Sequence, residues 1–363
     1  MKAATRFSRQ KDLPNSRRVC AQLSGCALLI GSACAHAHVY CVSSASQLQN
    51  ALTDSSDGGI YNGEDNFVHV VKGMYKVGSA TGNGPFHYRS TAANGQFVIF
   101  GGYNATCTNQ TNKASLTVLD GNSIAQVLTI RRSSSKISVF NLTIQNGETT
   151  QLGGGLCVNI GSGDTSGVDI EDNIIRDNHT IGQAGGLFVS AGGSGNELYL
   201  MNNVITGNRA DNGAGGVSVI SNGVAASIYN NTVTRNTTTV DGGTGGLYYG
   251  GATATVHINN NIFWNNTNYG IYLENGLVRL EYNDIGTRGG SAPQASSGNL
   301  STNPNFVDAT GGDFHLAGNS PLLAAVPQAF WSIDPDGMTS ASGGRMDMGA
   351  YYETIFIDGL DGD

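Results

Sequence analysis

VDIEDNII at residues 168–175 is the first of five aligned segments that decide the fold. The other four are LYLMNNVI (198–205), ASIYNNTV (226–233), VHINNNIF (256–263) and VRLEYNDI (278–285). Each segment alternates its residues with a period of two, which is the pattern of a β-strand with one buried face. One unit is too short to bury its own apolar face, whereas stacked units bury it against one another. The segments therefore predict a solenoid of stacked coils.

Asparagine and glycine recur at fixed places in these units. All five segments share one Asn, with spacings of 30, 28, 30 and 22 residues: Asn173, Asn203, Asn231, Asn261 and Asn283. Gly pairs open the other half of four units, at 154–155, 185–186, 215–216 and 245–246. Asn tolerates the left-handed conformation at a bend and can bond the Asn of the next coil, and Gly supplies positive φ. We interpret these residues as structural, and they predict an all-β chain with a single right-handed parallel β-helix.

The composition agrees with many short strands joined by tight turns. The chain of 363 residues contains 52 Gly and 36 Asn, about a quarter of the total, and only 13% charged residues. Gly and Asn form helices poorly, so a helical bundle is excluded. A hydrophobic share of 39% is too high for a disordered chain, and the Gly residues lack the three-residue period of collagen.

The first 37 residues have the pattern of a secretion signal. Basic residues precede an apolar stretch at 23–33, and Ala35-His36-Ala37 supplies the small residues of a cleavage site. The apolar stretch is too short for a transmembrane helix, and Leu23-Ser24-Gly25-Cys26 leaves a lipoprotein as an alternative. Cleavage after Ala37 would lower the formal net charge from −8 to −13, because six basic residues and one acid are lost. We therefore expect a secreted or cell-surface protein without nucleic acid or an anionic membrane as its partner.

Three cysteines remain after this cleavage. An oxidising compartment favours a disulfide, and we pair Cys41 with Cys107 because both lie in the turn-rich N-terminal part. Cys157 lies in an apolar run and is expected to be a buried thiol, and the Cys spacings match no zinc site. The stretch SASQLQNAL (44–52) predicts a short helix that caps the first coil.

The C-terminal part carries a resemblance to a known group. The segments NPNFVDATGGDFHLAGNSPLL (303–323) and RMDMGAYYE (345–353) are similar to the C-terminal signature of choice-of-anchor Q proteins, which are secreted right-handed β-helix repeat proteins with a pectate-lyase-like superfold. Asn303 stands where the group usually has an acid. The resemblance implies that the tail IFIDGLDGD (355–363) is a sorting or attachment signal, and a plain acidic tail is the alternative.

These features predict one β-helix domain with flanking segments. We expect a signal peptide (1–37), an N-terminal cap with the first coils (38–115), β-helix repeats (116–302), a C-terminal β-helix end (303–353) and a tail (354–363).

Titratable residues that point outward converge at one place in the repeats. His257, Arg279 and Glu281 lie one coil apart, which makes them candidates for a polysaccharide lyase or glycoside hydrolase on the lateral face. The outward positions form no repeated carboxylate row for calcium and no converging Asp pair. We expect no cofactor or metal, with calcium considered only for a lyase.

Aromatic side chains suggest a different function, because such rings stack on sugar faces. The candidates for glycan binding are Tyr199, Tyr229, Trp264 and Tyr272. We therefore expect a structural or glycan-binding module without catalysis, whose partner is a polysaccharide or a cell-surface glycan, and we keep the lyase or hydrolase as the alternative.

Overall fold

The computed structural model describes residues 37–132, 136–161, 167–193, 197–251, 254–327, 332–340 and 344–353. The chain divides into the units Met1–Ala35 and His36–Asp363, and the described residues belong to the second. The expected signal peptide, apart from its last residue, and the tail at 354–363 lie outside the described residues.

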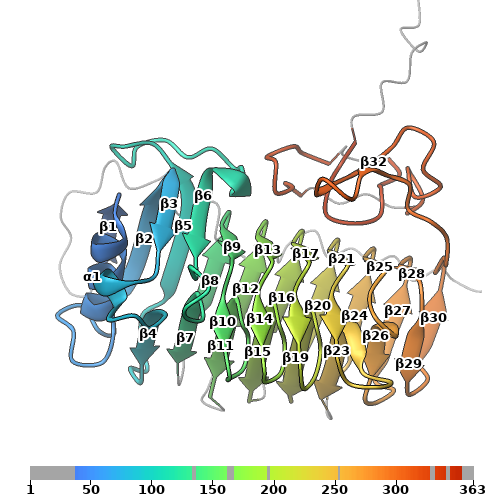
Figure 1. Cartoon of the computed structure of the whole chain (residues 1–363), viewed down its shortest axis with the longest axis horizontal. Coiled ribbons are helices and arrows are strands. Elements are labelled where there is room, and N and C mark those ends of the chain that lie inside the picture. Colours follow the sequence, from blue (N-terminus) through green and yellow to red (C-terminus); the bar gives the residue numbers. More distant parts are fainter. Residues whose placement is uncertain are drawn as a thin grey trace, which may run out of the picture. The chain divides into compact units, whose positions relative to one another are not determined.

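Parallel strands that stack coil upon coil make up most of the described chain (Figure 1). Sheet A contains β1 (Ala37–Val42), β2 (Asp65–Val71), β5 (Phe97–Tyr103), β8 (Ile137–Phe140), β12 (Gly167–Glu171), β16 (Glu197–Met201), β20 (Ala225–Tyr229), β24 (Val256–Asn259), β27 (Val278–Glu281) and β30 (Ala295–Ser297). Sheet B contains β3 (Gly73–Lys76), β6 (Thr117–Asp120), β9 (Thr143–Gln145), β13 (Ile174–Arg176), β17 (Val204–Thr206), β21 (Thr232–Thr234), β25 (Ile262–Trp264) and β28 (Asp284–Ile285).

Two further parallel sheets complete the coils. Sheet C contains β4 (Phe86–Ser90), β7 (Leu128–Arg132), β11 (Leu156–Ile160), β15 (Leu187–Gly192), β19 (Val217–Asn222), β23 (Thr244–Gly251), β26 (Tyr269–Leu273) and β29 (Arg288–Gly290). Sheet D contains β10 (Glu148–Thr149), β14 (His179–Thr180), β18 (Arg209–Ala210) and β22 (Thr237–Thr238). Outside these sheets, the described residues also form helix α1 (Ala45–Ser55), two 3₁₀ turns at Ser79–Thr81 and Ala114–Leu116, and the antiparallel pair β31 (Phe306–Asp308) and β32 (Asp313–Leu316).

The core follows the alternation seen in the sequence. Within sheet A, Val168 and Ile170 are fully buried, and the parallel register stacks them on Leu198 and Leu200 of the next coil. The same inward positions continue through the repeats and meet the inward side chains of sheets B and C in one cluster. This arrangement confirms the predicted right-handed parallel β-helix.

The shared asparagines form a ladder of hydrogen bonds between coils. Asn203 Oδ1 accepts bonds from Asn173 N (3.1 Å) and Asn173 Nδ2 (3.1 Å), and Asn203 Nδ2 donates to Asn231 Oδ1 (3.0 Å). The same bonds continue through Asn261 and Asn283 to Asn299. These side chains therefore satisfy buried polar groups at the bend between sheets A and B.

The left-handed residue at this bend differs from the prediction. The residue before each ladder Asn adopts positive φ, and the ladder Asn itself does not: the left-handed residues are Asp172, Asn202, Asn230, Asn260 and Tyr282. The ladder Asn thus supplies its amide, while its predecessor turns the chain and directs its own side chain outward.

The Gly pairs also serve a different purpose from the predicted one, since none of them has positive φ. A Cβ at Gly154 would lie 2.5 Å from the carbonyl oxygen of Gly185, and one at Gly186 would lie 2.8 Å from that of Gly216. Such distances are impossible for a real side chain, so Gly is required because successive coils approach closely.

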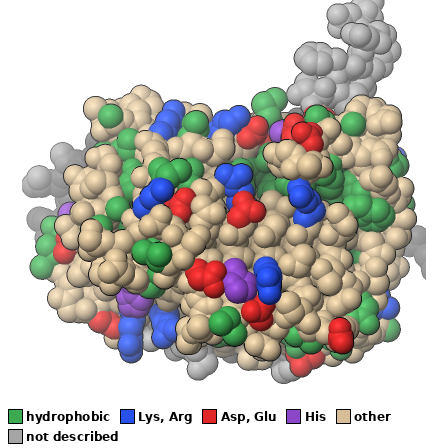
Figure 2. All heavy atoms as spheres, in the orientation of Figure 1, with side chains coloured by type: hydrophobic (Ala, Val, Ile, Leu, Met, Phe, Trp, Pro, Cys, Tyr) green, Lys and Arg blue, Asp and Glu red, His purple; other side chains and the backbone are tan. Residues whose placement is uncertain are grey.

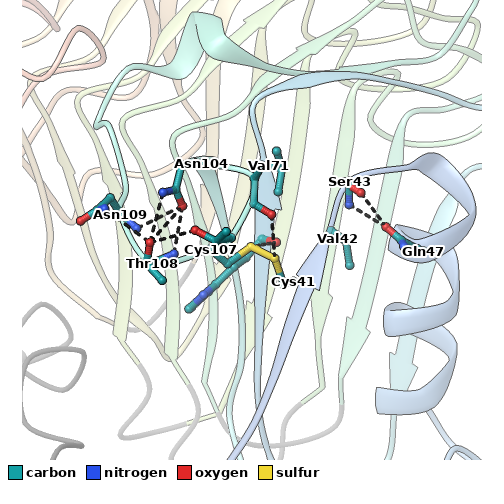
Figure 3. Close-up of a disulfide and its surroundings, with 12 residues drawn as sticks. Cys41, Val42, Ser43, Gln47, Val71, Asn104, Cys107, Thr108 and Asn109 are labelled. Carbon is teal, nitrogen blue, oxygen red and sulfur yellow. Dashed lines mark hydrogen bonds between the residues drawn. A yellow bond between two sulfur atoms is a disulfide. The ribbon is translucent and has the colours of Figure 1, made fainter.

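A short helix and a disulfide secure the first coil. Helix α1 (Ala45–Ser55) begins at the N-cap Ser44, whose hydroxyl accepts a bond from Gln47 N, and it buries Leu48 and Leu52 against the solenoid. Cys41 of β1 and Cys107 form a disulfide between the first strand and the loop after β5 (Figure 3). Because 66 residues separate the two cysteines, the bond restricts a long segment of the unfolded chain.

The C-terminal part departs from the prediction. We expected residues 303–353 to end the β-helix, but their described residues add no coil and fold back over the outer face of sheet B (Figure 1). We call these described residues the C-terminal lobe. Val204 and Ile262 point outward from sheet B, and the lobe covers them with Phe314, Leu322 and other apolar side chains. An outward apolar row needs such a cover, and the lobe supplies it in place of a further coil.

The left-handed asparagines position this lobe. Tyr352 Oη donates a hydrogen bond to Asn202 Oδ1 (2.8 Å) and accepts one from Asn230 Nδ2 (2.9 Å). Asn260 Nδ2 donates to the carbonyl oxygen of Asp347 (3.1 Å). Three successive coils therefore present one Asn to the ladder inside and another, Asn202, Asn230 or Asn260, to the lobe outside.

Candidate functional site

The outer face of sheet C carries two rows of side chains, because alternate residues of each strand point away from the core. The parallel register gives the first row as His87, Thr129, Cys157, Phe188, Ser218, Tyr248 and Tyr272. The second row is Arg89, Arg131, Asn159, Ser190, Ile220 and Gly250. Between these positions lie the buried residues of the core, such as Val189 and Leu247.

Cys157 is a free thiol on this face and is buried despite pointing outward. It packs with Phe188 and with Ala184 of the Gly-rich turn before β15. Burial raises the pKa of the Cys157 thiol to about 11, so the group is a neutral apolar contact at neutral pH. The turn that contains Ala184 therefore covers the middle of the first row, at Cys157 and Phe188, and leaves the end with Tyr248 and Tyr272 open.

An aromatic groove lies at the open end. Tyr248 and Tyr272 come from neighbouring strands, and their rings lie nearly parallel, with centroids 5.8 Å apart and 9° between planes. They line a cavity of about 420 Å³ together with Ile220, Val240 and Glu274. We call this the tyrosine groove. Its lining combines these apolar and aromatic side chains with Gln183 and the Glu274 carboxylate.

The electrostatics of the groove keep Tyr248 neutral. Burial and the hydrogen bond to the Glu274 carboxylate raise the pKa of Tyr248 to about 12. The Tyr248 hydroxyl is thus a donor to Glu274 throughout the physiological range. The groove combines ring faces with a fixed carboxylate acceptor, which is the combination that recognises a sugar through its apolar face and its hydroxyl groups.

The four predicted glycan-binding aromatics lie on three different sheets. Tyr272 lines the tyrosine groove, whereas Tyr199 and Tyr229 point outward from sheet A on adjacent strands. Trp264 lies on the outer side of sheet B and packs against the lobe cluster around Leu322. The four residues therefore do not form one site.

The sequence-based candidates did not include Tyr248, the partner of Tyr272. The sequence feature that could have identified Tyr248 is the run LYYGG at 247–251, because alternation in a strand directs one tyrosine inward and its neighbour outward. The structure has Tyr249 at 1% exposure in the core and Tyr248 half-buried in the groove.

The catalytic candidates lie together on the outer face of sheet A. His257 is directly opposite Arg279 in the register of β24 and β27, and Arg279 Nη2 lies 3.6 Å from Glu281 Oε1. Burial and the charge of Arg279 lower the pKa of His257 below its ordinary value, although the Glu281 carboxylate acts in the opposite direction. The imidazole is therefore neutral at pH 7, and the arginine forms an exposed pair of small energetic value.

A second cavity lies between the C-terminal lobe and sheet B. It has a volume of about 550 Å³, and its walls carry Arg176 and Lys113 as well as the lobe residues Asp313, His315 and Asp336. His315 Nδ1 lies 2.7 Å from Asp313 Oδ1, and Lys113 Nζ lies 3.2 Å from Asp336 Oδ2. Four of the charged groups of this cleft are thus paired, His315 with Asp313 and Lys113 with Asp336.

Other charged side chains gather on the face shown in Figure 2. On sheet D, His179 Nδ1 lies 2.8 Å from Glu148 Oε1, and its Nε2 lies 3.4 Å from Asp211 Oδ2. In the part of the chain that the structure describes, no group of His, Cys, Asp and Glu is arranged to hold a metal ion. The same part contains no helix with the length and apolar character needed to cross a membrane.

Comparison with known proteins gives the family. No curated protein and no solved structure shows a significant similarity to this chain. A family model described as "right handed beta helix region" matches residues 107–322, which is more than half of the chain. These residues contain most of the stacked coils, the Asn ladder and the tyrosine groove. The chain therefore belongs to the right-handed β-helix family.

Proposed function

We propose that this protein is a secreted or cell-surface β-helix protein that binds glycan in the tyrosine groove of sheet C and does not cleave it. The parallel pair Tyr248 and Tyr272, open to solvent beside Glu274, is the observation that carries this proposal. Two rings on successive coils offer a stacking platform held rigidly by the strands beneath it.

Three features support export to the cell exterior. Residues 1–37 have the composition of a signal peptide, and Cys41 and Cys107 form a disulfide, which is typical of oxidising compartments. The C-terminal lobe resembles the choice-of-anchor Q signature, whose members are secreted. Within the lobe, the signature residues Ser320 and Asp347 bond the backbone at Pro304 and at Ala324 and Glu353. This placement gives the signature a structural role at the side of the solenoid and leaves sheet C free for a ligand.

The proposal predicts that Tyr272→Ala weakens glycan binding about tenfold, because stacking on one ring is worth roughly 1–2 kcal/mol. The full chain would be tested by affinity electrophoresis against a panel of acidic and neutral polysaccharides. Tyr199→Ala is the matched control, since it removes a half-buried outward tyrosine from sheet A. If every polysaccharide that retards the native protein retarded Tyr272→Ala equally, the groove would not be the binding site.

A lyase or hydrolase remains the alternative function. It is favoured by the position of His257 directly opposite Arg279 on the neighbouring strand. The same panel, incubated with and without calcium, separates the two functions through product release. Unsaturated or reducing-end products that disappear in both His257→Ala and Arg279→Ala would establish the enzyme. Binding without product would support the glycan-binding module.

A further inference from the structure

The expected cleavage after Ala37 gives the mature chain an amino-terminal histidine. The signal peptide ends in Ala35-His36-Ala37, and His38 follows it directly. In the precursor, the nitrogen of His38 belongs to a peptide bond, and its lone pair is delocalised into the neighbouring carbonyl group. Cleavage converts this nitrogen into a free amine, whose lone pair is available to a metal ion. Any metal site that uses this nitrogen therefore requires removal of the signal peptide.

The structure holds the His38 side chain in place at the start of β1. Its ring stacks on Tyr61, with centroids 3.6 Å apart and 17° between planes, and it meets the Tyr40 ring edge-on at 4.3 Å between centroids. The backbone is fixed as well, because β1 pairs with β2 and places His38 opposite Asn66. Ala37 is exposed and His38 is partly exposed, so ions reach this end of the strand. The imidazole is thus held beside the position where the new amine forms.

Two carboxylates give this end of the solenoid a negative field. Burial raises the pKa of Tyr40 to about 12, and the charges of Asp54 and Glu64 add to this effect, although a hydrogen bond with Ser55 opposes it. Because the Tyr40 ring contacts His38, the same charges act near the imidazole and favour a cation there. No three His, Cys, Asp and Glu side chains of the described residues are arranged to hold a metal ion. The new amine therefore has to supply the ligand that the side chains lack.

We propose that the mature protein binds a divalent copper ion through the amine nitrogen and the imidazole Nδ1 of His38. This inference rests on the proposed export, because only an exported chain loses its signal peptide, and it adds a metal site at the end of the solenoid. The two nitrogens belong to one residue and close a chelate ring around the ion. Imidazole suits copper, and Cu²⁺ binds nitrogen sites more tightly than the other divalent first-row metals. We therefore expect Ni²⁺ and Zn²⁺ to bind more weakly at the same place.

The first measurement identifies the amino terminus of the exported protein. The full chain, including residues 1–37, is expressed in a bacterial host, and intact-mass spectrometry gives the first residue of the product. We expect a mass that corresponds to a chain beginning at His38. A first residue other than His38 would overturn the inference. Recovery of the uncleaved chain alone would overturn the proposed export as well, whereas glycan binding would still be decided by the Tyr272→Ala comparison.

The second measurement is the affinity of the metal-free mature protein for Cu²⁺, obtained by competition with a chromogenic chelator. The variant H38Q removes the imidazole. A run of glycines inserted between Ala37 and His38 separates the amine from the imidazole and keeps every native side chain. Each variant should weaken Cu²⁺ binding by about tenfold or more, because one nitrogen of the chelate is lost. His87→Gln is the matched control, because it removes an exposed histidine from β4 and should bind Cu²⁺ as the native protein does.

Electron paramagnetic resonance of the Cu²⁺-loaded protein provides a second readout. The native protein should show hyperfine splitting from nitrogen ligands, and both variants at His38 should change this spectrum. Equal Cu²⁺ affinity and identical spectra of the native protein, H38Q and the glycine insertion would overturn the inference. That result, obtained with a chain that begins at His38, would leave both export and glycan binding standing.

Discussion

Replacing Asn203 with Ala is expected to lower the free energy of unfolding by about 4 kcal/mol. The side chain lies inside the ladder, with a rung on either side, and is fully buried. It accepts from Asn173 N and Nδ2, and it donates to Ile170 O, Met201 O and Asn231 Oδ1. Alanine removes these five bonds, worth roughly 1 kcal/mol each, and leaves the buried Asn173 N–H without its acceptor. Urea unfolding followed by circular dichroism measures the change.

Asn299→Ala is the matched control for this experiment. Asn299 is the last rung, accepts from Asn283 and is partly exposed, so water replaces the lost bonds. We expect less than about 1 kcal/mol for this variant. If Asn203→Ala unfolded at the same urea concentration as Asn299→Ala, the ladder would not be a main source of stability.

Gly349→Ala is expected to release the C-terminal lobe from sheet B. Gly349 has φ +96°, and a Cβ there would lie 2.6 Å from Ile262 Cδ1 and 2.8 Å from Thr232 Oγ1. Backbone strain and the clash together cost about 3 kcal/mol. The change also displaces Gly349 N from Asn260 O and Ala350 N from Thr232 Oγ1. The outward side chains Val204 and Ile262 would then face solvent.

Limited proteolysis measures this release. Gly349→Ala should be cut rapidly between residues 303 and 353 while the coils remain intact. Gly318→Ala is the control, because Gly318 is an exposed lobe residue with open space around its Cβ position. Equal resistance of the two variants to protease would show that the contact of Gly349 with sheet B does not hold the lobe.

The coils could be predicted from the sequence because their repeats combine two strong local signals. The period-two alternation around Val168 and Ile170 identifies the buried face, and the regular recurrence of Asn173 and its equivalents identifies stacking in register. Each coil repeats the environment of the last, so a local pattern is enough to define the fold.

The C-terminal lobe could not be predicted in this way, because its contacts are long-range and do not repeat. Tyr352 bonds Asn202, which is 150 residues away, and no spacing in the sequence indicates that pairing. The sequence indicates no separate role for Asn202, which directly precedes the ladder residue Asn203. Its outward role became visible when the structure placed it at positive φ with its amide directed to the lobe.

The candidate site was only partly accessible to sequence reasoning. Tyr272 was among the candidates, but the sequence does not indicate that it lies on a different sheet from Tyr199 and Tyr229, because alternation gives the direction of a side chain and not the sheet that carries it. The pairing of Arg89 with Arg131 on the outer face of sheet C could not be predicted, because the two residues lie 42 positions apart in coils of irregular length. Only the strand register places them side by side.

A crystal structure of the full chain with a bound oligosaccharide tests glycan binding on sheet C most directly. The ligand would be a fragment of whichever polysaccharide the protein retains most strongly. We predict density along sheet C, with a sugar ring stacked on Tyr248 or Tyr272 and the chain extending toward Ile220 and Ser190. Density confined to sheet A, beside Tyr199, Tyr229 or His257, would contradict this account.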